Sequence, residues 1–289
     1  MLNSSILILL YNKQITESKT LSSLISSDIQ FNHARLVIWN NGPNKLSSYD
    51  VSHLEDLGYE VVVKETLNNE SLAVVYNCFI YENKAEKYIF LDDDSSLNSD
   101  YIKAACGSAN SIVSMPLITS GGVVVNPKVN SSVCCKDQEL TSNDKIITIG
   151  SGLVLGHDIV NEMCDKISSV FDERFYLYGV DTTFCLRLKE LQLISKIKLI
   201  DGFEHSMSRF EKESEEVSHF RKVERSYDFG LTLKYYYPKK KAFFEILMYM
   251  IMTFKRKLLK QPTEFSFFLI VKSFLTGKHY RNVSHGKKI

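Results

Sequence analysis

The chain has 289 residues, of which 44% are hydrophobic and 24% are charged. This length and apolar content suit one large α/β domain with an appendage, and they exclude a disordered chain. The formal net charge of +1 conceals an asymmetry. From Leu231 onward, 13 Lys and Arg side chains stand against two acids, whereas the preceding residues carry 22 basic and 32 acidic side chains. The sequence therefore predicts an acidic body followed by a basic tail.

Cysteine usage and the apolar segments bear on the cellular compartment. The six cysteines form no C-x-x-C pair, and the first ten residues lack the basic region and the apolar length of a signal peptide. Two apolar stretches near the C-terminus, 242–254 and 265–275, are too short to span a bilayer. We therefore expect a cytoplasmic protein with reduced thiols.

Strands alternate with helices in the first 92 residues. Compact apolar runs predict buried strands at 4–11, 36–39, 60–64 and 88–91. Helical patterns are expected around Leu21, Leu24 and Ile25, at 51–57, and from 68 to 81. This alternation predicts βαβ units, and hence an α/β fold with a mostly parallel, Rossmann-like sheet flanked by helices.

The pattern is looser after residue 100. Strands are expected at 112–118, 123–125, 146–154 and 196–200, and a helix is expected at 158–167. Residues 126–143 are polar and are predicted to form a surface loop. Small residues in the middle of 146–154 would let another group approach the backbone closely.

Three carboxylates, Asp92, Asp93 and Asp94, end the fourth expected strand. Ligands of open α/β sheets gather outside the carboxyl ends of the strands. On an extended segment Asp92 and Asp94 point to one side and Asp93 to the other, so the outer pair can share one divalent cation. The alternative is an acidic turn that, with Ser95 and Ser96, caps the next helix.

Two later residues are further candidates for the site. Asp181 follows an aromatic loop and enters the first turn of an expected helix whose Phe184 and Leu188 pack inward. The helix dipole alone favours an acid at such a position. His205 follows the strand expected at 196–200, where a lone histidine is either a structural residue or a metal ligand.

Taken in order, these motifs resemble the family-2 glycosyltransferases of the GT-A fold, especially the bacterial rhamnosyl- and galactofuranosyltransferase-like branch. The resemblance spans about residues 6–206. The matching segments are Tyr11-Asn12, Asn40-Asn41-Gly42-Pro43, Asn69 with Asn77, Leu91-Asp92-Asp93-Asp94-Ser95, Ser151-Gly152, Asp181-Thr182-Thr183-Phe184-Cys185-Leu186-Arg187, and His205.

The resemblance implies an inverting, metal-dependent glycosyltransferase. It implies a dTDP-rhamnose-like or UDP-galactofuranose-like donor and, as acceptor, a hydroxyl of a lipid-linked oligosaccharide in bacterial surface polysaccharide (O-antigen or capsule) biosynthesis. Asp181 would be the general base, and the ion would be Mn²⁺ or Mg²⁺. The residues implied to bind the donor are Tyr11, Asn12, Asn40, Asn69, Asn77, Asp92 and Asp93, and those implied to bind the metal are Asp92, Asp94 and His205.

Four positions depart from the family pattern, and one of them is Pro43, which stiffens the turn after the second expected strand. Asn40 stands where the family usually has an Asp that reads the nucleobase, Ser71 replaces a glycine, and Val180 replaces an acid that often precedes the catalytic Asp. The nucleobase of the donor is therefore left open.

The domain plan follows from the resemblance and the charge asymmetry. We expect a catalytic domain at 1–230, with a nucleotide-sugar half at 1–110 and an acceptor half at 111–230, and a basic, aromatic, helical tail at 231–289. The tail is expected to attach the enzyme to the anionic inner face of the cell membrane, because Lys239-Lys240-Lys241 and Lys255-Arg256-Lys257 flank an apolar run. The alternative is that the tail packs on the acidic body. No nucleic-acid partner is expected, and the oligomeric state is open.

Two other functions compete with this interpretation. A HAD-like phosphohydrolase also places an Asp-x-Asp motif, here Asp92 and Asp94, at a strand end, but it would need the motif near the first strand. A non-catalytic subunit that binds a nucleotide-sugar or a glycan is the second alternative, and the retained Asp94, Asp181 and His205 count against it.

Overall fold

The computed structural model describes residues 1–206 and 214–283. Within them the chain forms two compact units. The first unit contains Met1–Glu70, Val75–Val170 and the described residues from Arg187 to Ser206. The second contains Ser71–Val74, Phe171–Leu186 and residues 214–283.

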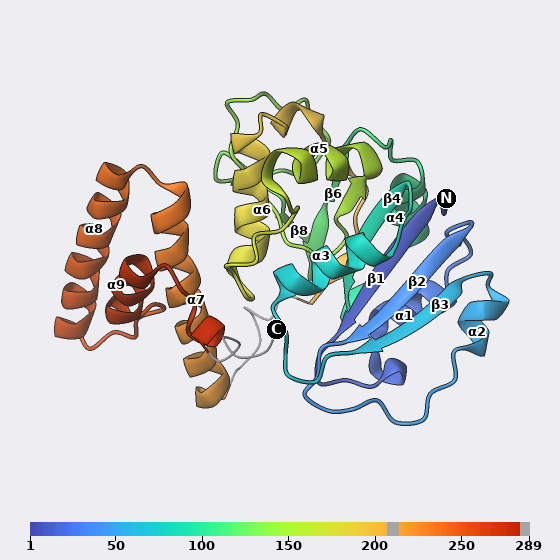
Figure 1. Cartoon of the computed structure of the whole chain (residues 1–289), viewed down its shortest axis with the longest axis horizontal. Coiled ribbons are helices and arrows are strands. Elements are labelled where there is room, and N and C mark those ends of the chain that lie inside the picture. Colours follow the sequence, from blue (N-terminus) through green and yellow to red (C-terminus); the bar gives the residue numbers. More distant parts are fainter. Residues whose placement is uncertain (207–213, 284–289) are drawn as a thin grey trace. The chain divides into compact units, whose positions relative to one another are not determined.

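A seven-stranded sheet in the order β13-β6-β12-β4-β1-β2-β3 is the centre of the first unit (Figure 1). Neighbouring strands are parallel, except that β12 runs antiparallel to both β4 and β6. The expected mostly parallel sheet is thus confirmed. Its strands are β1 (Ser4–Leu10), β2 (Ala34–Asn40), β3 (Glu60–Glu65), β4 (Lys87–Asp92), β6 (Val113–Pro116), β12 (Val154–Gly156) and β13 (Ile197–Ile200).

Helices cover both faces of this sheet, which explains why its strands are continuous apolar runs. On one face, alternate residues of β1 such as Ile6 and Ile8 share a core with α1 (Lys19–Ile25), α2 (Ser52–Asp56) and α4 (Ser99–Cys106). On the other face, α3 (Leu72–Glu82) places the rings of Tyr76 and Phe79 within 5.0 and 5.4 Å of Phe90. The central strands are therefore fixed from both sides.

Two small sheets accompany the large one. The first consists of β5 (Ser95–Ser96), β14 (Glu204–His205), β7 (Ile118–Ser120) and β8 (Val123–Asn126), and the second consists of β10 (Ser132–Val133), β9 (Lys128–Val129) and β11 (Ile146–Ile147). The remaining elements of this unit are η1 (Ile15–Glu17), α5 (His157–Ile167) and η2 (Ile194–Lys196).

The structure corrects two expectations in this region. The segment 126–143 is not only a loop, because it contains β9 and β10. The single strand expected at 146–154 is divided into β11 and β12. Gly152, between them, has φ +85°, and a Cβ there would lie 2.5 Å from the Pro116 ring and 2.7 Å from the Phe203 ring. A left-handed residue in this crowded position ends an extended segment.

The second unit is helical in its described C-terminal part. Gly230 lets α7 (Glu215–Tyr236) approach α9 (Phe267–Thr276), since a Cβ there would lie 2.3 Å from the carbonyl oxygen of Ile270. Leu233, Ala242 and Ile270 form the core between α7, α8 (Lys239–Leu258) and α9. The unit also contains the start of α6 (Gly179–Glu190) and η4 (Tyr280–Val283). The domain boundary expected after residue 230 falls within α7.

The helices and the cysteines also bear on the expectations from the sequence. No helix among residues 1–206 and 214–283 is long and apolar enough to cross a membrane. All six cysteines are free thiols.

Candidate metal and nucleotide site

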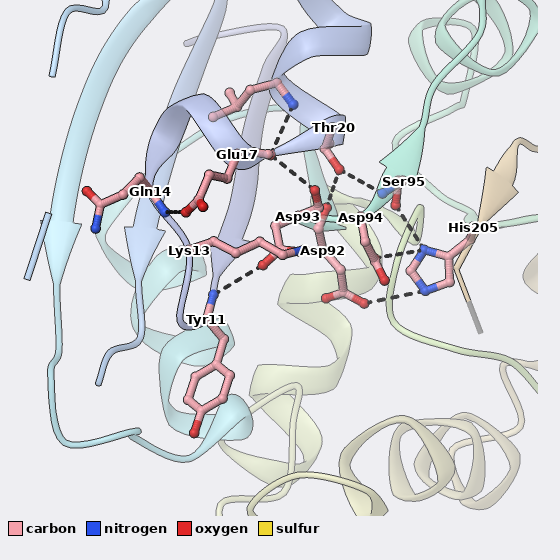
Figure 2. A network of polar contacts seen from close by, with 12 residues as sticks. Tyr11, Lys13, Gln14, Glu17, Thr20, Asp92, Asp93, Asp94, Ser95 and His205 are labelled. Carbon is pink, nitrogen blue, oxygen red and sulfur yellow. Dashed lines mark hydrogen bonds and ion pairs between the residues drawn. The ribbon is translucent and has the colours of Figure 1, made fainter. Parts of the chain in front are cut away.

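Three successive carboxylates at the end of β4 face two directions, as the strand alternation predicts (Figure 2). His205 Nε2 lies 3.9 Å from Asp92 Oδ2, and His205 Nδ1 lies 3.3 Å from Asp94 Oδ1. Asp93 points elsewhere and forms an ion pair with Lys13. One ligand atom each from Asp92, Asp94 and His205 lies within 4.8 Å of the others. The end of β4 thus brings two acids and an imidazole together.

Strand pairing carries His205 to the acids. Strand β14 pairs antiparallel with β5, and this register places His205 opposite Ser95, the residue after Asp94. The backbone of Gly202 passes so close to Leu117 that an added Cβ would lie 1.9 Å from the Leu117 carbonyl oxygen. The Glu204 carboxylate accepts hydrogen bonds from the amides of Gly121 and Gly122. These contacts fix β14, and with it the imidazole.

Two buried serines orient the imidazole. Ser151 Oγ accepts a hydrogen bond from the Asp92 amide (3.1 Å) and hydrogen bonds with Ser95 Oγ (2.9 Å). Ser95 Oγ in turn hydrogen bonds with His205 Nδ1 (3.1 Å). When Nδ1 carries the proton and donates a hydrogen bond to Ser95 Oγ, the lone pair of Nε2 is available to a metal ion. Such an outer partner on the second ring nitrogen is typical of histidine ligands.

The electrostatics of the cluster favour a bound cation. The protein atoms packed around the Asp92 carboxyl group, together with Asp94 and Asp93, raise its pKa to about 6, although His205 and Lys13 oppose this rise. Burial, again opposed by His205, also raises the pKa of Asp94. A raised pKa means that burial and the neighbouring negative charges destabilise the ionised form of each carboxyl group. A divalent cation among them would remove that penalty.

The donor set fits a hard or borderline divalent ion. Asp94 Oδ1 is buried and, among residues 1–206 and 214–283, has no hydrogen-bond partner, so its lone pairs are available to a ligand. Carboxylate oxygens alone suit Mg²⁺, and an added imidazole nitrogen shifts the preference toward Mn²⁺. The residues predicted as metal ligands are therefore together and chemically suited to an ion.

A second group of polar residues surrounds Asp93, where the loop after β1 passes the end of β4. The Tyr11 amide donates to Asp93 Oδ2 (3.2 Å), and Tyr11 Oη accepts a hydrogen bond from Asn69 Nδ2 (3.4 Å). Lys13 adds a positive charge at the same carboxylate. The structure thus brings together Tyr11, Asn69 and Asp93, three of the residues predicted to bind the donor.

The other residues predicted to bind the donor have different surroundings. Asn12 accepts a hydrogen bond from Asn44 (2.9 Å). Asn40 is fully buried, and its side chain bonds Glu65, the Asn44 carbonyl and the Gly42 amide. Through these hydrogen bonds the Asn40 side chain stabilises the turn after β2. Asn77 lies in α3 and is half-buried.

Asp181 lies in the first turn of α6, as expected. It is half-buried and belongs to the second unit, whereas Asp92, Asp94 and His205 belong to the first.

Sequence analysis missed several residues that shape the site. Thr20, at the start of α1, donates its hydroxyl to the Asp92 carbonyl and accepts from the Ser95 amide (3.0 Å). Ser18 Oγ donates to the Asp93 carbonyl (3.2 Å). Lys13 could have been found, because it follows Tyr11 in a loop after β1 and β1 neighbours β4. Thr20 and Ser18 carry no comparable signal.

Comparison with known proteins shows the fold. No protein-family model and no curated protein matches the chain. Solved structures do match: Staphylococcus aureus TarS 1–349 has a TM-score of 0.52 at 15% identity, with 80% of this chain and 64% of that chain covered. The same TarS fragment in complex with UDP-GlcNAc has a TM-score of 0.55 at 18% identity, with 80% and 66% covered. The chain thus spans less than two thirds of the TarS fragment, and the likeness supports the expected GT-A-like fold.

Proposed function

We propose that the protein is a metal-dependent glycosyltransferase that uses a nucleoside-diphosphate sugar. The observation that carries this proposal is the Asp92, Asp94 and His205 set at the carboxyl end of β4, in a fold shared with TarS, which binds UDP-GlcNAc. In such a fold, the end of a central parallel strand is where a nucleotide binds.

The residues of the first unit have distinct roles in this proposal. Asp92, Asp94 and His205 hold a divalent ion, which when bound neutralises the diphosphate leaving group. Lys13 and Asp93 fix the loop of Tyr11, whose exposed ring offers a surface for the nucleoside. Ser95 and Ser151 orient His205.

Asp181 is the proposed general base. Asp181 accepts the proton of the acceptor hydroxyl as that oxygen attacks the anomeric carbon, and the reaction inverts the configuration. The resemblance favours a dTDP-rhamnose-like or UDP-galactofuranose-like donor and a lipid-linked glycan acceptor of bacterial surface polysaccharide synthesis. UDP-GlcNAc, bound by TarS, is a further donor to test.

Helix α8 supports a membrane-surface partner. The outer stripe, which we define as Phe243, Leu247, Ile251, Phe254 and Leu258, recurs every three or four residues and is 39–75% exposed. The opposite side of α8, including Ala242, packs on α7 and α9. Lysine and arginine side chains stand at both ends of the helix. An exposed apolar stripe between basic ends fits the headgroup region of an anionic bilayer.

The two competing functions remain testable. A phosphohydrolase of the HAD type would carry its aspartates after the first strand, whereas Asp92 follows the fourth strand in chain order. A non-catalytic binding subunit would bind a nucleotide-sugar without turnover. A phosphatase assay and a transfer assay separate these outcomes from the proposed one.

Calorimetry with a panel of nucleotide-sugars tests the proposal. UDP-GlcNAc, UDP-galactofuranose, dTDP-rhamnose and GDP-mannose are titrated into the protein with Mn²⁺ or with a chelator. We expect at least one donor to bind with Mn²⁺ and to weaken at least tenfold in the chelator. If the panel gives no metal-dependent binding while the protein hydrolyses a simple phosphate ester, the phosphohydrolase function replaces this one.

A further inference from the structure

A second cluster of buried titratable side chains belongs to the second unit. Glu224 and Asp228 occupy successive turns of α7, His279 lies between α9 and η4, and all three side chains are at most 4% exposed. His279 Nε2 lies 3.6 Å from Glu224 Oε2 and 3.9 Å from Asp228 Oδ1, and none of these three atoms has a hydrogen-bond partner in the part of the chain that the structure describes. Burying such groups costs folding free energy. Their other atoms indicate what offsets that cost.

The remaining carboxylate oxygens connect the cluster to the chain around it. Glu224 Oε1 accepts a hydrogen bond from Tyr280 and pairs with Arg281 Nε (3.0 Å). Asp228 Oδ2 accepts a hydrogen bond (2.8 Å) from the amide of Gly179, the first residue of α6. Asp228, on α7, thus accepts a hydrogen bond from one of the backbone amides at the start of α6 that have no partner within their own helix.

The segment before Gly179 is held by the same unit. The ring of His279 stacks on Tyr176 at a centroid distance of 4.6 Å. The guanidinium group of Arg225, also on α7, lies 4.8 Å from the Tyr178 ring. A Cβ on Gly179 would lie 2.4 Å from the Phe175 ring and 3.0 Å from Asp228 Cβ. The aromatic loop and the start of α6 therefore have little room to shift against α7.

We propose that Asp228 is a positioning residue that fixes the start of α6 and thereby the Asp181 carboxylate two residues later. This inference rests on the proposed role of Asp181 as the base. Misplacing a catalytic group by about 1 Å can cost about 100-fold in rate. Asp228 acts through the backbone of Gly179, and its carboxyl group keeps an acceptor oxygen in either protonation state.

Three variants at two positions of α7 test the proposal. Asp228→Ala removes the acceptor, Asp228→Asn retains an oxygen that can accept the Gly179 hydrogen bond, and Thr232→Val is the matched control. Thr232 is buried one turn further along α7, and its hydroxyl donates to the Asp228 carbonyl (2.8 Å). Each variant is assayed with the nucleotide-sugar that binds in the panel above. Amide hydrogen exchange of residues 171–186 is measured in the same samples.

Asp228→Ala should lower kcat at least tenfold, leave the donor KM within twofold, and speed exchange at the start of α6. Asp228→Asn should restore most of the turnover, and Thr232→Val should change neither readout. In an Asp181→Asn background, Asp228→Ala should cause no further loss, because its effect passes through Asp181. A fully multiplicative loss, or unchanged turnover and exchange in folded Asp228→Ala, would overturn the proposal.

Two controls keep the outcome interpretable. If Asp228→Ala does not fold, Gly179→Ala is assayed in its place, since its added methyl group displaces α6 from Asp228, and the same losses are expected. If Asp181→Asn alone retains full turnover, the proposed base is wrong, and the exchange measurement still decides whether Asp228 fixes α6.

Discussion

Asp92, Asp93 and Asp94 are consecutive, yet they meet different partners. Asp93 pairs with Lys13, whereas Asp92 and Asp94 face the imidazole of His205. This division separates a carboxylate that orders a loop from two that can share an ion. Variants at single positions of the motif should therefore have different effects.

We expect Asp94→Ala to abolish metal-dependent donor binding, because it removes a buried oxygen that has no hydrogen-bond partner among the described residues. The affinity for donor in Mn²⁺ should fall at least tenfold, or about 1.4 kcal/mol, when measured by calorimetry. Asp100→Asn removes an exposed acid six residues later and serves as the matched control. Donor binding that keeps its strength and its metal dependence in Asp94→Ala would place the site elsewhere.

Asp181→Asn keeps the shape of the side chain and removes its basicity. Turnover should therefore fall by roughly 100-fold or more, while donor affinity stays within twofold. Steady-state kinetics and calorimetry on the same preparation check both parts. Near-normal kcat in this variant would mean that another group accepts the proton.

At the scale of elements, the two-residue strand β14 has a large effect on the site. It carries His205, and the close approach of Gly202 to the Leu117 backbone fixes its position. Because backbone atoms cannot move aside as a flexible side chain can, this contact should tolerate no added methyl group.

Gly202→Ala should therefore destabilise the first unit by roughly 1–3 kcal/mol and weaken Mn²⁺ binding by displacing His205. Thermal unfolding and Mn²⁺ titration measure the two effects. Gly107→Ala is the control, because its Cβ would meet nothing closer than 3.3 Å. Equal behaviour of the two variants would show that β14 shifts without consequence.

The start of α6 gives a prediction about pH. Burial, together with the charge of Glu224, raises the pKa of Asp228 from 3.8 to about 7. Between pH 3.8 and about 7, the folded chain keeps a proton on Asp228 that the unfolded chain has lost. The contribution of this proton to the free energy of unfolding is therefore fully present below pH 3.8 and is lost as the pH rises through about 7. Asp228→Asn cannot titrate at this position. Relative to wild type, its free energy of unfolding should rise between pH 4 and 7, as denaturant unfolding at each pH can measure.

Much of the fold could be predicted from local pattern. Buried runs such as Ile6 to Leu10 identify the central strands, because both faces of a parallel sheet are covered. The alternation of Asp92, Asp93 and Asp94 along the strand end was also predictable. The break at Gly152 was not, since it arises from contacts with Pro116 and Phe203, which are distant in sequence. The Asp228 contact with Gly179 links residues 49 positions apart, and no local pattern indicates it.

At the scale of the whole molecule, the charge asymmetry and the outer stripe of α8 predict attachment to a membrane surface. Each basic residue near an anionic bilayer contributes on the order of 1 kcal/mol, so a few suffice for reversible binding. Co-sedimentation at physiological salt should show binding to vesicles that contain phosphatidylserine and none to purely zwitterionic vesicles.

Point variants keep the core of the second unit intact in this test. Phe243→Glu combined with Ile251→Glu should abolish vesicle binding, whereas Tyr81→Glu should not, although Tyr81 is 86% exposed. If wild-type protein ignores anionic vesicles, the stripe packs on protein instead. A salt-sensitive dimer in sedimentation velocity would then identify a second copy as its partner.

The pairing of β5 with β14 also has a thermodynamic consequence. It joins Ser95 to His205 across 110 residues of chain, and the ligand set straddles that junction. An ion held by Asp92, Asp94 and His205 would act as a reversible cross-link that closes this long loop, whereas the unfolded chain presents no such preformed set. The free energy of ion binding would then add to the folding free energy of the first unit. The concentration of free divalent ions would thus regulate the stability of the folded protein as well as its catalytic activity.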